Sequence, residues 1–314
     1  MDTAFNQVTF AILPAALIGV TVNYLVVYSF FKIKLMRTSF GYLLASQGLA
    51  DALHCTTFLA IFSSMVLFNI QFLKTHSTHC FYILMLSFDV SLSCHFVISI
   101  NRCCAVWIPF KYPNIFTTKN TLFIIVLIWI IVPSTDNLFF EHICPTLYND
   151  DIHWFKYQNP DYCDTAAWYE DFMKTSFIML IFITIDMVTV LKVRRCRLTT
   201  VFTNHSQANS KREKWFLIQT VCQGVIFTLE NFTYYIVPFI TMDPVVLFFT
   251  GTFGFLLTHV LDGFVECFPD VVNTAKHVSV GAWTSRGQLD CCPKHSKFSQ
   301  ISMERVSLWG ISLI

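Results

Sequence analysis

Acidic and histidine side chains interrupt long apolar stretches of this sequence. They include Asp51, His54, Asp89, His95, Asp186, Glu230, His259, Asp262 and Glu266. An ionisable group in hydrocarbon is costly, so such residues generally face the interior of a helix bundle, where they pair, relay protons or line a path for ions or ligands. The sequence therefore predicts polar chemistry inside a bundle.

Four residues form a predicted intramembrane polar network: Asn23, Asp51, His259 and Asp262. A hydrogen bond between Asn23 and Asp51 would join the first two apolar stretches, and such contacts in a membrane contribute about 1 kcal/mol each. A sodium-sensitive switch is the alternative role for that pair. His259 and Asp262 lie three residues apart on one helical face, so they can pair with each other or with Asp51.

A second polar site is predicted where the third apolar stretch ends. Asn101 and Arg102 stand at that end, followed by Pro109 and Tyr112, which is a receptor-like arrangement. In this interpretation Arg102 faces the inner mouth of the bundle and any partner that docks there. The alternative is an arginine that extends its charged group to lipid phosphates as a membrane anchor.

The composition defines the elements that must position these residues. With 54% hydrophobic residues, 13% charged residues and 33 Phe, the chain is typical of a membrane protein. A bilayer core takes about 20 apolar residues per helix, and buried backbone groups must be satisfied internally, which favours helices. The predicted spans are about 8–31, 40–70, 78–108, 120–140, 167–191, 213–240 and 244–268. We predict an all-α membrane protein with a seven-transmembrane helix bundle over residues 1–270 and a tail over residues 271–314.

The basic residues alternate between the two sides of this bundle. Loops on one side hold Lys32, Lys34, Arg37, Lys111, Lys119 and the segment from Lys192 to Lys214, whereas the opposite loops hold only Lys74 and Lys156. Cytoplasmic loops are the basic ones in membrane proteins. The amino terminus is therefore predicted outside and the carboxyl terminus in the cytoplasm.

Several function classes find no support in the sequence. It contains no nucleophile motif, phosphate-binding loop, paired catalytic carboxylates or nucleic-acid signature, and Cys291-Cys292 lacks the second pair of ligands that a zinc site needs. We expect no enzyme, no cofactor, no metal and no nucleic-acid partner. The lipid bilayer is the one partner that composition predicts.

The long loop from Phe140 to Ala167 is acidic and rich in aromatic residues. It is either a lid that binds or filters ligands, or a solvated outer loop. Cys144 and Cys163 lie in it and Cys80 opens the third span, all on the oxidising side. Three cysteines allow three pairings, and the residues alone leave the choice open.

The chain resembles the Srx class of nematode serpentine chemoreceptors, which are G-protein-coupled receptors. The similarity spans nearly all of residues 8–268 and is strongest over His95–Val106, with further matches at Lys211-Arg212-Glu213, Gln219, Gln223-Gly224, Cys144, Cys163 and His259–Gly263. The resemblance implies a chemosensory receptor for a small molecule, in the plasma membrane of sensory neurons, coupled to a heterotrimeric G protein. Asn101, Arg102, Tyr112, Lys211 and Arg212 would form its coupling site.

The sequence departs from the broader rhodopsin-like pattern in two ways that matter here. Asn101-Arg102-Cys103 replaces an acidic-Arg-aromatic triplet, so the carboxylate that would restrain Arg102 is missing and higher basal activity is expected. Cys80 lies about one helical turn closer to Arg102 than the usual loop-tethering cysteine. That shift favours the local pairing of Cys144 with Cys163.

The ligand pocket is expected in the outer halves of spans three to seven, under the acidic loop. Asp89 lies 13 residues before Arg102, which is about 20 Å along a helix, and Asp136, Glu230 and Tyr234 are further candidates. Two other functions remain open: a channel or transporter, because of the intramembrane acids, and a receptor-like subunit that does not signal.

Overall fold

The structure is a computed structural model that describes residues 2–33, 36–150, 154–200, 207–241 and 243–274. The side chains of 2–9, 196–200, 207–218, 220 and 268–274 are outside that description. The predicted tail over residues 271–314 therefore lies almost entirely outside the described residues.

Helices make up nearly all of the described chain. Seven long helical segments occur in these ranges: α1 (Asp2–Lys32); α2 (Ser39–Thr57), η2 (Phe58–Phe62) and α3 (Ser63–Leu67); α5 (Ser77–Trp107); α7 (Thr118–Asp136) and η3 (Asn137–Ile143); α8 (Pro160–Ala167), η4 (Trp168–Met173) and α9 (Lys174–Thr200); α10 (Gln207–Ile240); and α11 (Pro244–Leu247), η5 (Phe248–Thr252) and α12 (Phe253–Thr274). Segments labelled η are π-helical turns. Two short helices, α4 (Gln71–Thr75) and α6 (Tyr112–Ile115), lie in connections.

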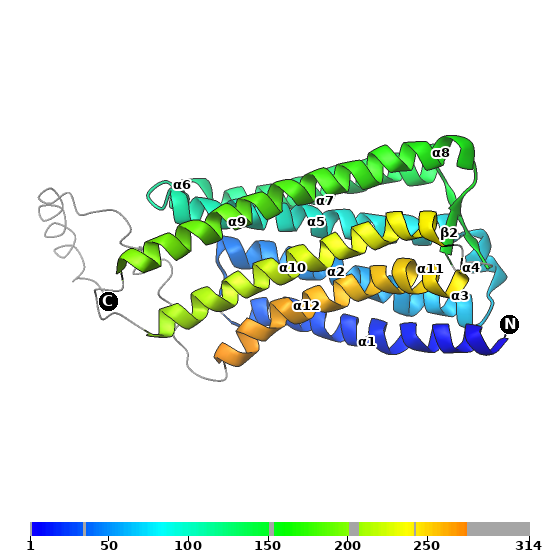
Figure 1. Cartoon of the computed structure of the whole chain (residues 1–314), viewed down its shortest axis with the longest axis horizontal. Helices are drawn as coiled ribbons and strands as arrows, with labels where there is room; N and C mark the ends of the chain where they lie inside the picture. The colour runs from blue at the N-terminus through cyan, green and yellow to red at the C-terminus, as the bar shows by residue number, and fades with distance from the viewer. Residues whose placement is uncertain (1, 34–35, 151–153, 201–206, 242, 275–314) are drawn as a thin grey trace, which may run out of the picture.

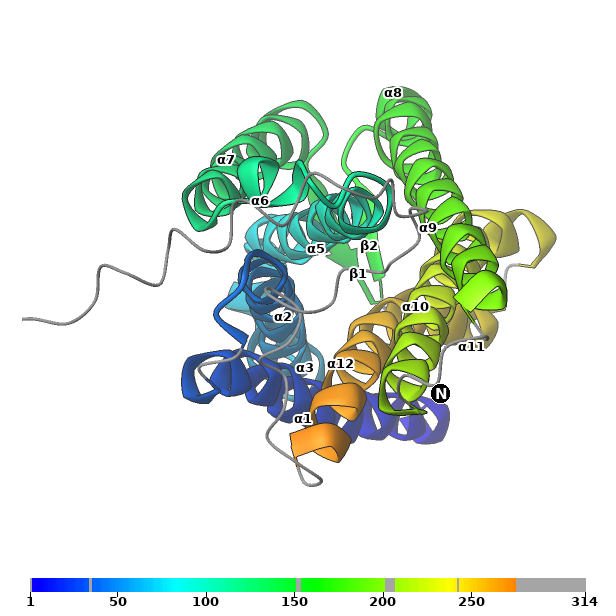
Figure 2. The same cartoon turned by 90° about the vertical axis from the view of Figure 1, so that its left-hand side faces the viewer.

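The long segments run side by side along the molecule and form a bundle (Figure 1). Seen along its axis, α1, α2, α5, α9, α10 and α12 follow one another around a ring, and α7 packs outside it against α5 and α2 (Figure 2). The helices α5, which contacts α2, α7 and α9, and α2, which contacts α1, α5, α7 and α12, are central to this packing. This confirms the predicted all-α bundle of seven membrane-length segments.

The outer surface of the bundle is apolar. Six helical segments in the described residues are long and apolar enough to cross a membrane; α10, with 34 residues, is the remaining long segment. Phe123, Ile130 and Ile131 of α7 expose more than half of their surface. In the most hydrophobic window of that span only 6% of the residues are buried inside the protein, so α7 presents most of its surface to lipid.

Several helices begin at residues that cap them. The side chains of Thr38 and Thr117 accept hydrogen bonds from Gly41 N and Asn120 N, and Asp243 caps α11 in the same way. These caps satisfy backbone N–H groups that have no partner inside the helix. Gly41 is required sterically, because a β-carbon there would collide with the carbonyl of Met36.

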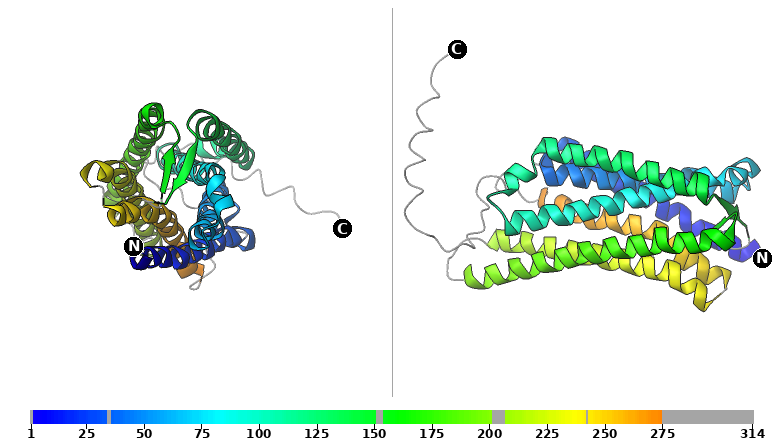
Figure 3. Two further views of the ribbon diagram at one scale, coloured as in Figure 1. Left: turned by 90° about the vertical axis from the view of Figure 1, so that its right-hand side faces the viewer. Right: turned by 90° about the horizontal axis from the view of Figure 1, so that it is seen from above.

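The loop between α7 and α8 contains a β-hairpin that the sequence analysis did not predict. Strands β1 (Thr146–Asn149) and β2 (Trp154–Tyr157) pair antiparallel, with Thr146 opposite Tyr157. Both strands lie across one end of the bundle, the end at which α1 starts (Figure 3). The fifth span also begins earlier than expected, at Pro160 instead of 167, because α8 continues through η4 into α9.

Candidate functional site

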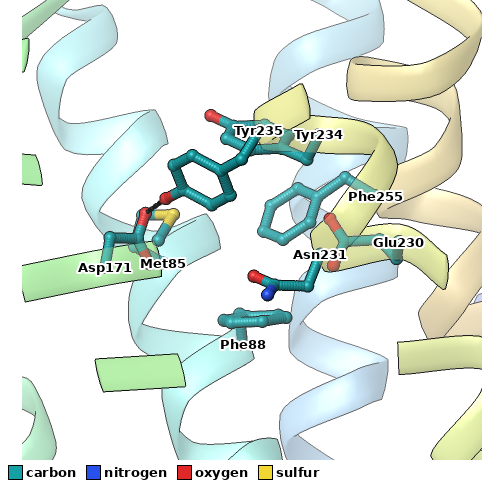
Figure 4. Close-up of a pocket in the computed structure, with 8 residues that line it drawn as sticks. All are labelled: Met85, Phe88, Asp171, Glu230, Asn231, Tyr234, Tyr235 and Phe255. Atoms are coloured by element: carbon teal, nitrogen blue, oxygen red, sulfur yellow. Dashed lines mark hydrogen bonds between the residues drawn. The ribbon is translucent and has the colours of Figure 1, made fainter. Parts of the chain in front are cut away.

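A cavity lies between four helical segments in the half of the bundle nearest the hairpin. It is lined by Met85 and Phe88 of α5, Asp171 of η4, Glu230, Asn231, Tyr234 and Tyr235 of α10, and Phe255 of α12 (Figure 4). The free space is about 10 Å³, which is room for about one water molecule. A larger ligand therefore needs these side chains to move apart.

Two of the four predicted pocket residues line this cavity, namely Glu230 and Tyr234. Asp89 does not, because its carboxylate pairs with the Lys174 amine at 2.6 Å. Asp136 lies beside Asp89 and is 3% exposed. Helical spacing predicted the depth of Asp89 in the bundle. It could not show that the Asp89 carboxylate forms an ion pair with Lys174 of α9.

The hairpin closes the bundle end above the cavity. Trp154 Nε1 donates a hydrogen bond of 3.0 Å to the Tyr234 hydroxyl, and the Trp154 ring packs edge-on against Phe255. Phe155, 6% exposed, inserts into the main hydrophobic core. Burial, followed by the charge of Asp150, raises the pKa of Tyr148 above its ordinary value. These contacts favour the lid interpretation of this loop over a fully solvated loop.

Covalent and polar links hold the hairpin in place. A disulfide joins Cys144 to Cys163, with their Cα atoms 5.5 Å apart, and Cys80 is a buried free cysteine. This is the local pairing that the position of Cys80 favoured. Lys74 pairs with Asp150 at the hairpin tip, and the Thr78 hydroxyl donates to Thr146 O at 2.6 Å.

Asp262 is the centre of a buried polar network near the middle of the bundle. Its Oδ2 accepts a hydrogen bond of 2.6 Å from Gln47 and lies 3.0 Å from His95 Nε2. Its Oδ1 accepts one of 2.8 Å from Gln223. The carboxylate is fully buried and links α12 to α2, α5 and α10. Gln47 was not predicted, and Gln223 was noted only through the family resemblance.

Asp51 and His259 form the second pair of this network. His259 Nδ1 and Asp51 Oδ1 are 2.6 Å apart, and both residues are fully buried. Of the pairings predicted for His259, this is the one that the structure contains. The His259 ring also lies against that of His54, with centroids 3.9 Å apart.

The predicted hydrogen bond between Asn23 and Asp51 is absent among the described contacts. Asn23 Nδ2 instead donates to the backbone oxygen of His259 at 3.1 Å. Asn23 thus joins α1 to α12, where Gly263 leaves room for its side chain. On α2, Asn23 Nδ2 contacts Cys55 Sγ at 3.9 Å, one helical turn beyond Asp51.

Three buried carboxyl groups meet beside this network. Asp51, Asp262 and Glu266 each offer an oxygen, and these oxygens lie within 4.8 Å of one another. Hard cations take oxygen ligands of this kind, whereas protons shared between the acids would serve the same electrostatic need. Asp51 is the one member of the predicted sodium switch in this donor set, because Asn23 is not part of it; a cation role for the three acids stays a prediction.

Arg102 is buried near the end of the bundle that lies away from the hairpin, and it faces a carboxylate. Its Nη1 lies 3.8 Å from Asp186 Oδ2, and the Ser99 hydroxyl donates to the same oxygen at 2.8 Å. Only 5% of Arg102 is exposed, and its guanidinium lies over the Phe40 ring. The triplet supplies no neighbouring carboxylate, as expected, but α9 supplies one from elsewhere, Asp186, which lies 84 positions later in the chain.

The other predicted coupling residues divide into two groups. Tyr112 donates from its hydroxyl to Asn101 Oδ1 at 3.4 Å, which fastens the turn containing α6 to the end of α5. Lys211 and Arg212 belong to α10, but their side chains lie outside the described residues. Whether they approach Arg102 therefore stays a prediction.

Comparison with known proteins gives one family. The family described as Serpentine type 7TM GPCR chemoreceptor Srx matches residues 13–269. A similar protein is Serpentine receptor class X 45 of Caenorhabditis elegans, which is 24% identical over 267 residues that cover 79% of this chain and 74% of that protein. Serpentine receptor class X-43 of the same organism is 24% identical over 241 residues, covering 76% of this chain and 75% of that protein.

Proposed function

Because the chain belongs to the Srx family of serpentine chemoreceptors, we propose that it is a G-protein-coupled receptor that binds a small molecule under the hairpin and activates a heterotrimeric G protein at the opposite end. The observation that carries this proposal is the buried pair of Arg102 and Asp186 at the end far from the cavity. An activating conformational change can break the contact between Arg102 and Asp186 and so free the arginine.

The orientation of the receptor follows from charge. Exposed basic side chains such as Arg37 and Arg194 lie at the Arg102 end, whereas the hairpin end carries the disulfide and acidic side chains such as Asp150 and Asp161. Basic loops stay in the cytoplasm, and disulfides form on the oxidising side of a membrane. We therefore assign the hairpin and the amino terminus to the outside of the plasma membrane, and Arg102 to the cytoplasmic side.

The same contacts suggest how a ligand would act. A ligand that separates α5, α10 and α12 at the cavity would strain the Asp262 network, which joins these helices to α2. Movement of α9 relative to α5 would then part Arg102 from Asp186 and open a groove for an amphipathic helix of the partner. A ligand drives this change only as far as it binds the open form more tightly.

The test is nucleotide exchange on G proteins in membranes from cells that express the receptor, screened against pools of volatile and water-soluble odorants. We expect at least one pool to stimulate exchange in the wild type and to have no effect on Arg102→Ala at equal surface expression. Arg37→Ala is the matched control, because Arg37 is an exposed arginine at the same end.

A response in Arg102→Ala as large as in the wild type would remove this residue from the mechanism. Silence of the wild type in every pool, at confirmed surface expression, would instead favour a transporter or a subunit that does not signal. Ion-flux and co-assembly measurements would then separate these two.

A further inference from the structure

The cavity of Figure 4 has an excess of acidic groups around it. Asp171 and Glu230 line it directly (Figure 4), and Asp89 and Asp136 are close enough to interact electrostatically with Asp171. Among the described residues, Lys174 is the one base within this group, and it is engaged by Asp89 at 2.6 Å. Four carboxyl groups thus share one amine, so the acidic groups at the cavity outnumber the positive charges that could neutralise them.

Glu230 is the acid left without a partner in this arrangement. It is 6% exposed, lines the cavity, and none of the hydrogen bonds or ion pairs between described residues involves its carboxyl group. Asp171, by comparison, accepts a hydrogen bond from the Tyr235 hydroxyl. A buried charge without a partner costs several kcal/mol, so Glu230 calls for a cation or a proton from outside the chain.

The remaining walls of the cavity are aromatic. Phe88 and Phe255 pack with ring centroids 5.3 Å apart, and Tyr234 lies 6.2 Å from Phe255 on the other side. The faces of such rings attract cations, most strongly when the site is shielded from water. The same rings accept apolar groups, so carboxylates and ring faces together suit a cation with carbon substituents.

We infer that this cavity binds small organic cations, such as protonated amines or quaternary ammonium compounds, with the charge beside Glu230 and Asp171 and the carbon groups against Phe88, Tyr234 and Phe255. This inference rests on the proposed function, since it names the ligand class of the same receptor pocket. An anionic ligand would meet two carboxylates, and a neutral ligand would leave the negative charge of Glu230 without a counter-ion.

The ligand enters by displacing the lid and the tyrosines. The hydrogen bond from Trp154 to the Tyr234 hydroxyl holds that ring over the cavity, and the free space of about 10 Å³ is smaller than any organic cation. Rotation of Tyr234 away from Trp154 enlarges the space without breaking a helix. Binding is therefore coupled to rotation of Tyr234 and to loss of its contact with the hairpin.

The test measures ligand binding in the absence of any G protein. Purified full-length receptor in lipid nanodiscs is heated with increasing choline, or with 3,3-dimethylbutan-1-ol, in which carbon replaces the choline nitrogen. We expect choline to raise the unfolding midpoint in a saturable manner, and the alcohol to require at least about tenfold higher concentration for the same shift, because the charge pairing at a buried site is lost.

The matched variants are Glu230→Gln and Glu170→Gln. Glu230→Gln should weaken choline binding at least about tenfold, whereas Glu170→Gln, next to Asp171 in the chain but exposed and not part of the cavity lining, should leave it unchanged. If Glu230→Gln fails to fold, the comparison of choline with 3,3-dimethylbutan-1-ol on the wild type still tests whether the cavity prefers a cation.

Equal shifts with choline and the alcohol, or no shift with choline, would overturn the inference. The outcome is separable from that of the proposed function. Saturable choline binding without G-protein activation would contradict the function alone, and activation by uncharged odorants alone would contradict the ligand class alone.

Discussion

The buried polar residues of this receptor depend on partners from other helices. Asp262 takes hydrogen bonds from three helices, Asp51 takes one from His259, and Arg102 faces Asp186. Inside a bilayer no water is available to hydrogen-bond such groups, so they must bond to other parts of the protein. Each carboxylate therefore constrains the distance between the helices that surround it. The network is therefore structural, and in the proposed mechanism it also transmits the conformational change.

The first prediction concerns Asp262. Asp262→Ala leaves the buried donors of Gln47, His95 and Gln223 without their acceptor, at a cost of about 1–3 kcal/mol each. Asp262→Asn keeps one acceptor oxygen and should be intermediate. Thermal unfolding in nanodiscs measures both, with Asp161→Ala at the exposed start of α8 as control. An Asp262→Ala receptor as stable as the wild type would show that the network carries no stability.

The sequence could predict the acids of this network but not their partners. Asp51, His259 and Asp262 stand out because each interrupts an apolar stretch. Gln47 and Asp186 were not assigned to a site, since helical periodicity gives the face of a residue but not its depth relative to another helix. The carboxylate that restrains Arg102 is therefore visible only in three dimensions.

At the scale of elements, the hairpin is the part that turns a helix bundle into a covered pocket. Trp154 and Phe155 point from β2 into the bundle, and the disulfide closes the loop at its base. Neither strand was predicted, because a strand of four residues contains too little alternation of polar and apolar residues to be recognised. Two π-helical turns beside the cavity, η4 and η5, were likewise invisible in an apolar sequence.

The second prediction concerns the disulfide. Cross-linking residues 19 positions apart restricts the unfolded loop and contributes roughly 3 kcal/mol. We expect Cys144→Ser to accelerate hydrogen exchange over 146–157, and the double variant with Cys163→Ser to behave in the same way. Cys80→Ser should have no effect on that segment, because Cys80 is a free cysteine. Peptides that join Cys163 to Cys80 in nonreduced digests would contradict this assignment.

The third prediction concerns the contact between lid and pocket. Tyr234→Phe removes the acceptor of Trp154 Nε1 and keeps the ring, so the hairpin loses a single hydrogen bond of about 1 kcal/mol. Faster hydrogen exchange at Trp154 and Phe155, with an unfolding midpoint lowered by no more than about 2–4 °C, is the expected result. Tyr162→Phe, on the exposed face of α8, is the control. Equal exchange in all three proteins would show that the lid is held by packing alone.

At the scale of the molecule, seven helical spans were predicted from apolar length, and the structure contains all seven. Several limits differ from those predicted, for example at the fifth span, where α8 begins the helix at Pro160 instead of 167. Composition and basic loops define the bundle because the bilayer imposes the length of every span. They cannot give the ring order of the helices, which depends on contacts between distant parts of the chain.

The fourth prediction concerns orientation. A peptide epitope added before Met1 should be accessible to antibody on intact cells, whereas one added after Ile314 should be accessible only after permeabilisation, because the basic loops stay in the cytoplasm. An epitope inserted beside Asp150 at the hairpin tip should follow the amino-terminal one. The reverse pattern would place the cavity inside the cell and contradict a receptor for external ligands.

The central claim is that the inner end of the bundle is held closed by Arg102 and Asp186 and that Arg102 is needed for coupling. It can be tested without knowing a ligand, by measuring basal nucleotide exchange on purified G protein with the receptor in nanodiscs. Loss of an interhelical contact of about 1 kcal/mol should raise basal exchange about fivefold in Asp186→Asn, whereas Arg102→Ala should lower it below the wild type. Equal basal exchange in all three proteins would contradict the account.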